Sequence, residues 1–526
     1  MINQLKQLLI ILKEETIKII RSKLFFNVIF CILLFLIFLS NYIYKSFSNI
    51  TIEQLLFSIQ TSEGTDTSTI VDGSIYVFSL MSIVYLILCS IINFVKKFFH
   101  KSILNGKVDK TKCNPYLLIN IINIVLLISV IIFISNKIGL SDYLLNNHKS
   151  TVFEEHYVDP KKVNIIASKQ KRNLIFIYIE SGESTFVSKK NGGAFEKSIT
   201  PNLEKLAYNN INFSYNKKIG GASMVTGTNW TTAGIISTTS GVPFKLNQAK
   251  NISNEKKGLL PGAYAIGDVL KDNGYQNYVM MGSYAVFGNR ENYFKAHGKY
   301  NIYDYEYAID HNWLPHNYKK WWGYEDSKLF KFAKDELKII SKNNKPFNLT
   351  LLTVDTHFID GYIEEQCTVP FEKKYLNAYY CSDYYLGDFI SWVKKQNFYE
   401  NTTIVITGDH LTMQANIVDM FDVKKNYERY IYNTFINSYI NTDNNKNRKF
   451  NSMDIYPTTL AALGFEIEGD RLGLGTNLFS SRKTLTEEKG FNYIEKELKM
   501  KSDFYNEKLL GNTYKQMLLD GKTKSK

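Results

Sequence analysis

Three long apolar stretches in the first quarter of the chain limit its fold more than any other feature. They cover about residues 24–44, 75–95 and 116–135, and none carries an acidic or basic side chain in its interior. A helix needs about 20 such residues to cross a bilayer. We therefore expect an all-α region of three transmembrane helices, followed by a soluble part.

The distribution of basic residues predicts how these helices cross the membrane. The segment before the first stretch carries five Lys or Arg residues, and the loop between the second and third carries six Lys residues. The loop between the first and second has Lys45 alone, against four acidic residues. Basic loops stay on the cytoplasmic side. Everything after residue 135 is therefore expected outside the cytoplasm.

The 526 residues exceed what one hydrophobic core usually serves. We expect an anchor and linker over 1–160, an α/β domain over 161–482, and a tail over 483–526 that forms one or two surface helices. The net charge of +13 fits either solvated lysine or attraction to anionic lipid head groups. No basic stripe with interleaved aromatic residues occurs, so nucleic acid is not an expected partner.

The soluble part alternates apolar strands with helical patterns. Strands are predicted at NLIFIYIE (173–180), PFNLTLLTVDTH (346–357) and TTIVITGDH (402–410), with helices between them, for example over 327–341 and 379–395. Such alternation predicts a mostly parallel central sheet. Ligands of such sheets bind beyond the carboxyl ends of the strands.

Each of these three strands ends in acidic residues, histidine or both. Glu180 ends the first, Asp355 and His357 follow the second, and Asp409 and His410 follow the third. A single charged residue at the end of a strand is often only solvated and has no function. Together, Glu180, Asp409 and His410 make a ligand set that suits Mn²⁺, Zn²⁺ or a similar divalent ion.

The segment GGASMVTGTNWTTAGIISTTSGVPF (220–244) is rich in Gly, Ser and Thr. It is either a flexible loop with helix caps or a loop that presents a metal-activated threonine at a helix N-terminus. Cys367 and Cys381 lie 14 residues apart with no nearby zinc-ligand pattern. If this part is outside the cell, the pair favours a disulfide over a zinc site.

Together these motifs resemble the alkaline-phosphatase/sulfatase superfamily, in the branch of lipoteichoic acid synthases and periplasmic-glucan phosphoglycerol transferases. The resemblance runs from about residue 173 to 480 and includes TPNLEKLA (200–207), GTNWTTAG (227–234), GNRENYFKAHG (288–298), VDTHF, GDH and the closing segment 453–480. It implies an alkaline-phosphatase/sulfatase-like domain in which Glu180, Thr231, Asp409 and His410 bind the metal. Thr231 is the implied nucleophile, and Arg290 and His357 the implied substrate-binding residues.

The implied activity is a membrane-bound phosphoglycerol transferase that moves glycerophosphate from phosphatidylglycerol to a glycan or polymer acceptor through a phospho-threonine. The implied cofactor is one divalent metal ion, with Mn²⁺ preferred over Mg²⁺ or Zn²⁺. The implied location is the cell (inner) membrane, multi-pass, with the catalytic domain periplasmic.

Two alternatives stay open. The first is a phosphoethanolamine transferase that acts on lipopolysaccharide or another glycan. The second is a non-catalytic receptor that binds glycan or lipid. A true sulfatase is excluded, because its formylglycine derives from a cysteine, and none lies between Cys113 and Cys367.

The chain departs from the branch at several positions. Asn229 occupies the usual place of a second glycine, and Gly288 the place of a tryptophan found in the synthases. Three spans are visible, where the synthases usually have five. Thr232 adjoins Thr231, and the residues alone do not decide between the two threonines.

Overall fold

A computed structural model describes residues 13–16, 18–19, 22–46, 50–61, 68–104, 115–140, 148–245, 258–422 and 427–511. The chain divides into two compact units. Unit 1 comprises residues 1–52 and 66–145, and unit 2 comprises residues 53–65 and 146–526. A short segment between the first two apolar stretches therefore groups with the large C-terminal part.

Unit 1 is built from three long helices, α2 (Lys23–Ser46), α4 (Ser68–Leu104) and α5 (Pro115–Lys137). Each contains a stretch long and apolar enough to cross a membrane: Lys23–Ser46, Val71–Ile91 and Ile119–Lys137. Phe26 and Phe30 of α2 pack against partly buried apolar residues of α4 and α5. Leu86 and Phe133 are 65% and 58% exposed. An outer surface this apolar identifies a membrane protein and confirms the three expected helices.

Unit 2 is centred on a seven-stranded sheet of the order β3-β8-β7-β2-β6-β4-β5. Strands β7, β2, β6, β4 and β5 are parallel to one another. At one edge β8 pairs antiparallel with β7, and β3 pairs antiparallel with β8. This arrangement confirms the expected α/β class with a mostly parallel central sheet. The strands span Asn173–Ile179 (β2), Gly221–Ala222 (β3), Gln276–Met281 (β4), Asn301–Tyr303 (β5), Phe347–Leu352 (β6), Thr402–Gly408 (β7) and Ile431–Ile436 (β8).

Two short antiparallel pairs lie apart from this sheet, β1 (Ile165–Ile166) with β9 (Glu466–Ile467), and β10 (Arg471–Leu472) with β11 (Gly475–Thr476). The α-helices described in unit 2 are α3 (Ile52–Gln60, of which residue 52 belongs to unit 1), α7 (Val152–His156), α8 (Pro201–Asn209), α9 (Thr231–Ser240), α10 (Ile266–Asp272), α11 (Arg290–Ala296), α12 (Tyr305–Asp310), α13 (Asp326–Ile340), α14 (Lys374–Val393), α15 (Ala415–Asp422), α16 (Ile455–Ala462), α17 (Leu485–Lys489) and α18 (Phe491–Lys499).

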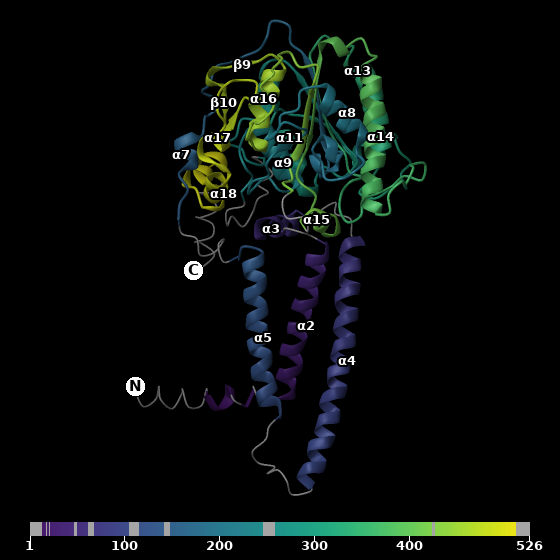
Figure 1. Cartoon of the computed structure of the whole chain (residues 1–526), viewed down its shortest axis with the longest axis vertical. Coiled ribbons are helices and arrows are strands. Elements are labelled where there is room, and N and C mark those ends of the chain that lie inside the picture. Colours follow the sequence, from purple (N-terminus) through teal and green to yellow (C-terminus); the bar gives the residue numbers. More distant parts are fainter. Residues whose placement is uncertain are drawn as a thin grey trace. The chain divides into compact units, whose positions relative to one another are not determined.

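Strand β2 is buried on both faces, because its apolar run leaves no side free for solvent. Leu174, Phe176 and Tyr178 point into one core cluster, which also takes in residues of α9, α10 and α16. Ile175 and Ile177 point into the other, with residues of α13 and α14. Side chains alternate along a strand, so one continuous apolar run serves both layers of helices (Figure 1).

The described part of the tail forms two α-helices, α17 and α18, each with exposed residues, and their apolar side chains face the core. Residues 512–526 of the expected tail lie outside the described residues. Leu485, Ile494 and Leu498 are buried in the same core cluster as β2. Glu495 of α18 also accepts hydrogen bonds from the backbone and hydroxyl of Thr226, at 2.8 and 2.7 Å. The mixture of Lys and Glu with apolar residues belongs to an amphipathic helix whose apolar face closes the core.

Candidate metal centre and nucleophile

The cluster of acidic residues and histidine forms where neighbouring strands end. In the sheet β2 lies between β7 and β6, with Ile179 opposite Gly408. Glu180 directly follows β2, and Asp409 and His410 directly follow β7. One ligand atom of each lies within 4.8 Å of the others, and all three side chains are buried. Parallel pairing therefore brings together two segments that are 229 residues apart, counting from 180 to 409.

Backbone contacts fix the direction in which these side chains point. Oδ1 of Asp409 accepts from the amides of Ser181 and His410, at 2.7 and 2.8 Å. Nδ1 of His410 lies 2.8 Å from the carbonyl oxygen of Leu411 and must carry a proton to bond it. In the neutral ring Nε2 of His410 is then the atom with the lone pair, and it lies 3.4 Å from Glu180 Oε1 and 3.5 Å from Asp409 Oδ2.

Burial and mutual charge shift the pKa values of this cluster strongly. Burial and the charge of Glu180 raise the pKa of Asp409 to about 7. Burial lowers the pKa of His410, but Asp409 and Glu180 outweigh it and raise this pKa to about 9. Burial raises the pKa of Glu180, but His357 and His410 outweigh it and lower this pKa to about 2. Two carboxylates this close are stabilised together only by positive charge.

The donor set fits a divalent cation. Oδ2 of Asp409 is buried and has no hydrogen-bond partner among the described residues. A buried carboxylate oxygen without a donor is costly unless a cation satisfies it. Oxygen from Glu180 and Asp409 together with imidazole nitrogen from His410 suits Mn²⁺ or Zn²⁺.

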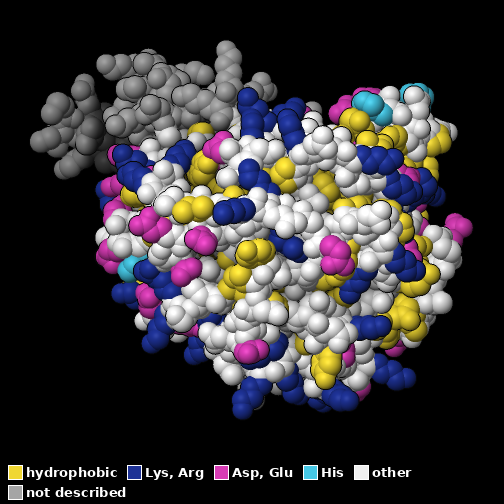
Figure 2. Space-filling model, turned by 90° about the horizontal axis from the view of Figure 1, so that it is seen from above, with side chains coloured by type: hydrophobic (Ala, Val, Ile, Leu, Met, Phe, Trp, Pro, Cys, Tyr) yellow, Lys and Arg dark blue, Asp and Glu magenta, His cyan; other side chains and the backbone are white. Residues whose placement is uncertain are grey.

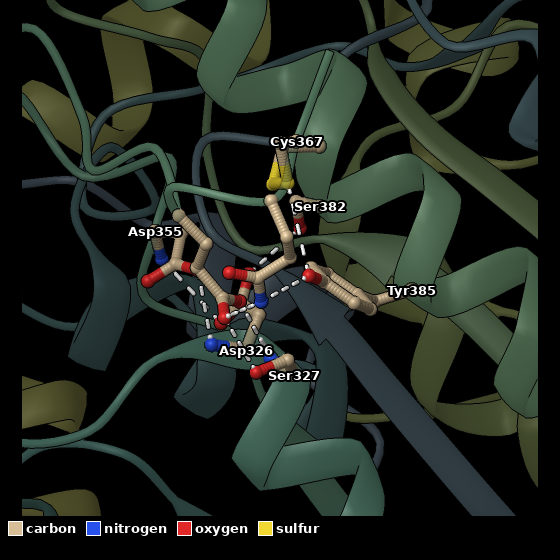
Figure 3. Close-up of a disulfide and its surroundings, with 9 residues drawn as sticks. Asp326, Ser327, Asp355, Cys367, Ser382 and Tyr385 are labelled. Atoms are coloured by element: carbon tan, nitrogen blue, oxygen red, sulfur yellow. Dashed lines mark hydrogen bonds between the residues drawn. A yellow bond between two sulfur atoms is a disulfide. The ribbon is translucent and has the colours of Figure 1, made fainter.

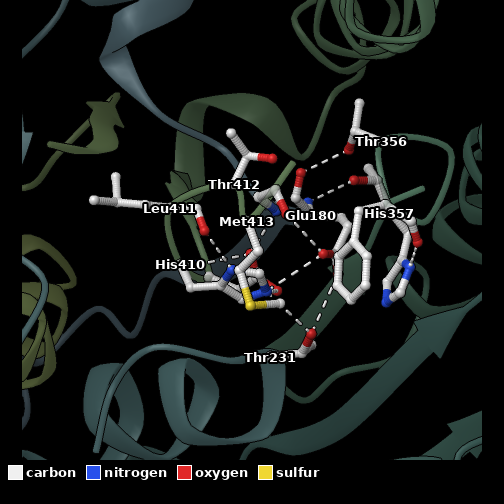
Figure 4. Close-up of polar contacts among 12 residues, drawn as sticks. Glu180, Thr231, Thr356, His357, His410, Leu411, Thr412 and Met413 are labelled. Atoms are coloured by element: carbon white, nitrogen blue, oxygen red, sulfur yellow. Dashed lines mark hydrogen bonds and ion pairs between the residues drawn. The ribbon is translucent and has the colours of Figure 1, made fainter. Parts of the chain in front are cut away.

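Thr231 is the first residue of α9 and faces this cluster (Figure 4). Its Oγ1 lies 3.3 Å from Glu180 Oε2 and 3.5 Å from His410 Nε2. Helix α9 can approach the backbone of Asp409 because residue 234 is a glycine. A Cβ at Gly234 would lie 2.0 Å from the carbonyl oxygen of Asp409. Thr231 is half-buried, whereas the three cluster residues that it faces are buried.

Thr232 points elsewhere. It is 2% exposed, and its hydroxyl donates to the carbonyl oxygen of Gly288 at 2.7 Å. Successive helical residues point about 100° apart, so only one of the two threonines can face the cluster. The geometry favours Thr231 as the nucleophile and gives Thr232 a role in packing.

Arg290 is a buried cation at the start of α11. Its Nε donates to the carbonyl oxygen of Phe287 at 2.8 Å, and its Nη2 to Ser283 Oγ and the carbonyl oxygen of Tyr284, at 3.1 and 2.7 Å. Burial lowers its pKa to about 10. No ion pair joins it to an acidic side chain within the described residues. A buried guanidinium without a carboxylate partner suits an anionic ligand.

His357 lies in the loop after β6, near the other side of the cluster (Figure 4). Its Nδ1 contacts the carbonyl oxygen of Phe358, so Nδ1 carries the proton and Nε2 has the lone pair. Burial lowers its pKa. Its ring packs against Trp322, with centroids 4.6 Å apart. Trp322 was not foreseen, because no pattern in the sequence connects it with His357.

Asp355 does not join the cluster, although it follows a strand end as Glu180 and Asp409 do. Its Oδ2 accepts from the amide of Asp326 at 3.0 Å, while Oδ1 of Asp326 accepts from the amide of Val354 at 2.8 Å (Figure 3). Burial and the charge of Asp326 raise the pKa of Asp355. The pair joins the start of α13 to the loop that leads to His357.

A disulfide between Cys367 and Cys381 lies beside this pair, with Cα atoms 5.7 Å apart (Figure 3). Ser382, next to Cys381 on α14, donates to Asp326 Oδ2 at 2.7 Å. The disulfide and the carboxyl pair therefore tie the His357 loop to α13 and α14.

Glu183 and Arg429 form a support that sequence reasoning missed. Arg429 Nε and Nη2 bond the two carboxylate oxygens of Glu183, at 2.9 and 2.6 Å. The amide of Thr412 donates to Glu183 Oε1 at 3.1 Å. Glu183 thereby connects the loop after β2 to the loop after His410. Its place inside the strand-end motif IESGES was the one available signal.

Figure 2 shows how the charged side chains of the described residues are distributed over one face of unit 2. Basic and acidic side chains are interspersed there rather than separated. This pattern favours solvated lysine as the source of much of the net charge.

The chain is similar in sequence to known proteins. Residues 172–465 match the Sulfatase family. Over 270 residues the chain is 31% identical to phosphoglycerol transferase I of Escherichia coli O127:H6 (strain E2348/69 / EPEC). This match covers 50% of this chain and 33% of that protein. It is 29% identical over 365 residues to phosphoglycerol transferase I of Salmonella choleraesuis (strain SC-B67), covering 67% of this chain and 44% of that protein.

Among solved structures, the lipoteichoic acid synthase LtaP from Listeria monocytogenes matches with a TM-score of 0.47 and 20% identity, over 61% of this chain and 79% of that chain. The chain matches less than half the length of the two phosphoglycerol transferases. The family match, in contrast, covers more than half of this chain and includes every strand-end residue of the cluster. The chain therefore belongs to the Sulfatase family.

Proposed function

We propose that this protein is a membrane-bound, metal-dependent phosphoglycerol transferase. It moves glycerophosphate from phosphatidylglycerol to a glycan or polymer acceptor outside the cytoplasm, through a phospho-threonine. The observation that carries the proposal is the hydroxyl of half-buried Thr231, which lies 3.3 Å from Glu180 and 3.5 Å from His410. The family membership and the names of the two relatives support the reaction class.

Glu180, Asp409 and His410, together with Thr231, would hold the cation, for which we propose Mn²⁺ ahead of Mg²⁺ or Zn²⁺. When bound, such a cation lowers the pKa of a nearby hydroxyl and offsets phosphate charge. The contribution of the chain is to aim the ligand atoms, through the Ser181 and Leu411 backbone contacts, and to exclude water from the buried side of the cluster.

The reaction is two displacements at phosphorus. In the first, Thr231 Oγ1 forms a bond to the phosphorus of phosphatidylglycerol and gives up its proton, the bond to the diacylglycerol oxygen breaks, and diacylglycerol leaves with that proton. In the second, the oxygen of an acceptor hydroxyl forms a bond to phosphorus, the bond to Thr231 Oγ1 breaks, and the acceptor proton reaches Thr231 by way of His357. Arg290 offsets the charge on the phosphate oxygens. His357 accepts the proton of the acceptor hydroxyl on Nε2, which has the lone pair because Nδ1–H is bonded to Phe358.

The proposed location is the cytoplasmic (inner) membrane, with unit 2 on its outer, periplasmic side. The lysine-rich loops support this orientation, since they flank the apolar helices on the opposite side. The disulfide supports it too, because disulfides persist mainly in oxidising compartments.

Mass spectrometry of the full-length protein incubated with phosphatidylglycerol and Mn²⁺ tests the proposal. We expect a glycerophosphate on the peptide that contains Thr231, together with released diacylglycerol, and neither product with Thr231→Ala. Phosphatidylethanolamine in a parallel incubation tests the other cargo. Modification from phosphatidylethanolamine alone would replace the proposed donor, and turnover of phosphatidylglycerol by Thr231→Ala would refute the covalent route.

A further inference from the structure

Helix α3 belongs to the catalytic unit although it lies between two apolar helices in the sequence. Residues 53–65 group with residues 146–526, whereas α2 and α4, which precede and follow α3, belong to the other unit. Phe57 of α3 is 2% exposed and is part of the main core cluster of unit 2. Helix α3 is thus part of the domain that carries the site, although it contains no motif and lies outside the family resemblance.

The apolar contacts of α3 are made with the nucleophile segment. The ring centroid of Phe57 lies 5.8 Å from that of Trp230 and 5.4 Å from that of Phe244. Trp230 directly precedes Thr231, and Phe244 lies four residues beyond the end of α9 at Ser240. Phe57 therefore packs against chain on both sides of the helix that presents the nucleophile. Its Cε1 also lies 3.9 Å from where a Cβ on Gly288 would be.

The polar contacts of α3 reach two further parts of the site. Gln54 is 5% exposed, and its Nε2 donates to Met413 Sδ at 3.0 Å, three residues after His410. Its Oε1 lies 3.5 Å from Nδ2 of Asn229, two residues before Thr231. One side chain thus connects the nucleophile loop to the metal-ligand loop.

The residue after α3 contacts the turn that leads to Arg290. The carbonyl oxygen of Thr61 accepts from the amide of Gly288 at 3.5 Å, and the carbonyl oxygen of Gly288 accepts from Thr232. Asn229 departs from the usual pattern of the nucleophile loop, and Gly288 replaces the tryptophan of the synthases. Both positions are places where α3 makes contact.

We propose that α3 is part of the catalytic site, in which Gln54 and Phe57 are positioning residues that hold the nucleophile loop so that Thr231 faces Glu180 and His410. The proposal rests on the proposed function of Thr231 as nucleophile. A displacement of about 1 Å at a reacting group can cost about a hundredfold in rate, so contacts that fix Thr231 matter to turnover even though they touch no substrate.

The test compares full-length Gln54→Leu, Phe57→Ala and Phe57→Leu with the parent protein. Ser58→Ala is the matched control, because Ser58 is an exposed residue of the same helix, one turn after Gln54. Two substrates are used, phosphatidylglycerol in vesicles and water-soluble bis(4-nitrophenyl) phosphate. For each protein kcat, KM and Tm are measured, and hydrogen–deuterium exchange is followed in peptides covering residues 226–240.

We expect kcat on both substrates to fall by about tenfold to a hundredfold in Gln54→Leu and Phe57→Ala, with little change in KM. Phe57→Leu keeps the site filled and should retain most of the turnover. Exchange in residues 226–240 should rise in the two impaired variants but not in Ser58→Ala. Gln54→Leu and Phe57→Leu remain informative if Phe57→Ala does not fold.

A lower Tm with unchanged kcat and unchanged exchange in residues 226–240 would overturn the proposal, because α3 would then only stabilise the fold. Failure of the proposed function has a different signature. In that case the parent protein releases no diacylglycerol from phosphatidylglycerol, while the comparison of exchange and of soluble-substrate kcat among the variants still decides the role of α3.

Discussion

The metal side of the site and its substrate side are built by different means. Glu180, Asp409 and His410 directly follow adjacent parallel strands, and the pairing of Ile179 with Gly408 sets their separation. Arg290 begins α11 and is held by the carbonyl oxygens of Phe287 and Tyr284. His357 lies in the loop after β6 and is held by ring contacts with Trp322 and Phe358. The difference teaches that the sheet places the proposed metal ligands, whereas local packing places the residues that we propose to bind the substrate.

The largest effects should therefore come from the metal side. Asp409→Ala and Glu180→Ala each remove a ligand oxygen, and we expect turnover to fall by about four powers of ten or more. Both variants should remain folded, because the strands themselves are unchanged. Diacylglycerol release and bound metal are measured together, with Asp388→Ala, a largely exposed surface carboxylate on α14, as control. Near-normal turnover with unchanged metal content would contradict the ligand assignment.

A smaller loss of turnover is expected from changes on the proposed substrate side of the site. His357→Ala should lower kcat by about a hundredfold or more if Nε2 takes the acceptor proton, while metal content stays normal. Because burial lowers the pKa of His357, the parent protein should lose activity only below the ordinary histidine range near 6.5. In His357→Ala, the residual activity should not show this decrease at low pH. His311→Ala, an exposed histidine, is the control, and an unaltered pH profile in His357→Ala would remove the proposed base.

The metal side should also reveal itself in stability against pH. The pKa of Asp409 is raised from 3.8 to about 7, and that of His410 from 6.5 to about 9. In each of these two pH ranges the folded metal-free protein therefore binds more protons than the unfolded chain. Its free energy of unfolding should fall as pH rises from about 4 to about 9, by up to about 1.4 kcal/mol per pH unit for each proton. The lowered pKa of Glu180 acts in the opposite direction, but only below 4.5.

Added Mn²⁺ should reverse this trend, because it binds the deprotonated ligands. The increase in Tm on adding Mn²⁺ is therefore expected to grow from about pH 6 to about pH 9, as measured by thermal unfolding in buffers matched for ionic strength. Asp409→Ala should abolish the increase. An increase that is the same at every pH would show that the cation does not replace protons at this cluster.

The smallest effect is expected one residue from the nucleophile. Thr232→Val keeps the shape of the side chain and removes one hydrogen bond to Gly288, which should cost about 1 kcal/mol of unfolding free energy or somewhat more, since the carbonyl oxygen is buried. Turnover should stay close to that of the parent protein. Thr231→Val, the same change at the neighbouring position, should abolish turnover. A dead Thr232→Val beside an active Thr231→Val would exchange the two roles.

The same contrast explains what could be predicted from the sequence. Apolar runs that end in Glu180 and in Asp409–His410 predict parallel strands whose ends meet, and the sheet contains them as neighbours. The α/β class and three apolar helices follow from equally local patterns. Asp355 shows the limit, since it ends a similar run but bonds Asp326 on α13, a partner fixed only by tertiary packing. Trp322, the Glu183–Arg429 pair and α3 act through contacts between distant segments, which leave no periodic signal in one sequence.

The main core cluster has a consequence for how the protein is made. It includes Phe57 near the start of the chain and Leu509 near its end, together with Ile494 and Leu498 of α18. A ribosome adds residues in order, so this core cannot close until residue 509 has been synthesised. Long-range contacts of this kind slow folding and leave apolar surface exposed meanwhile. A nascent chain that stops before α18 would keep its membrane helices but carry an open catalytic unit, which quality-control proteases would recognise and degrade.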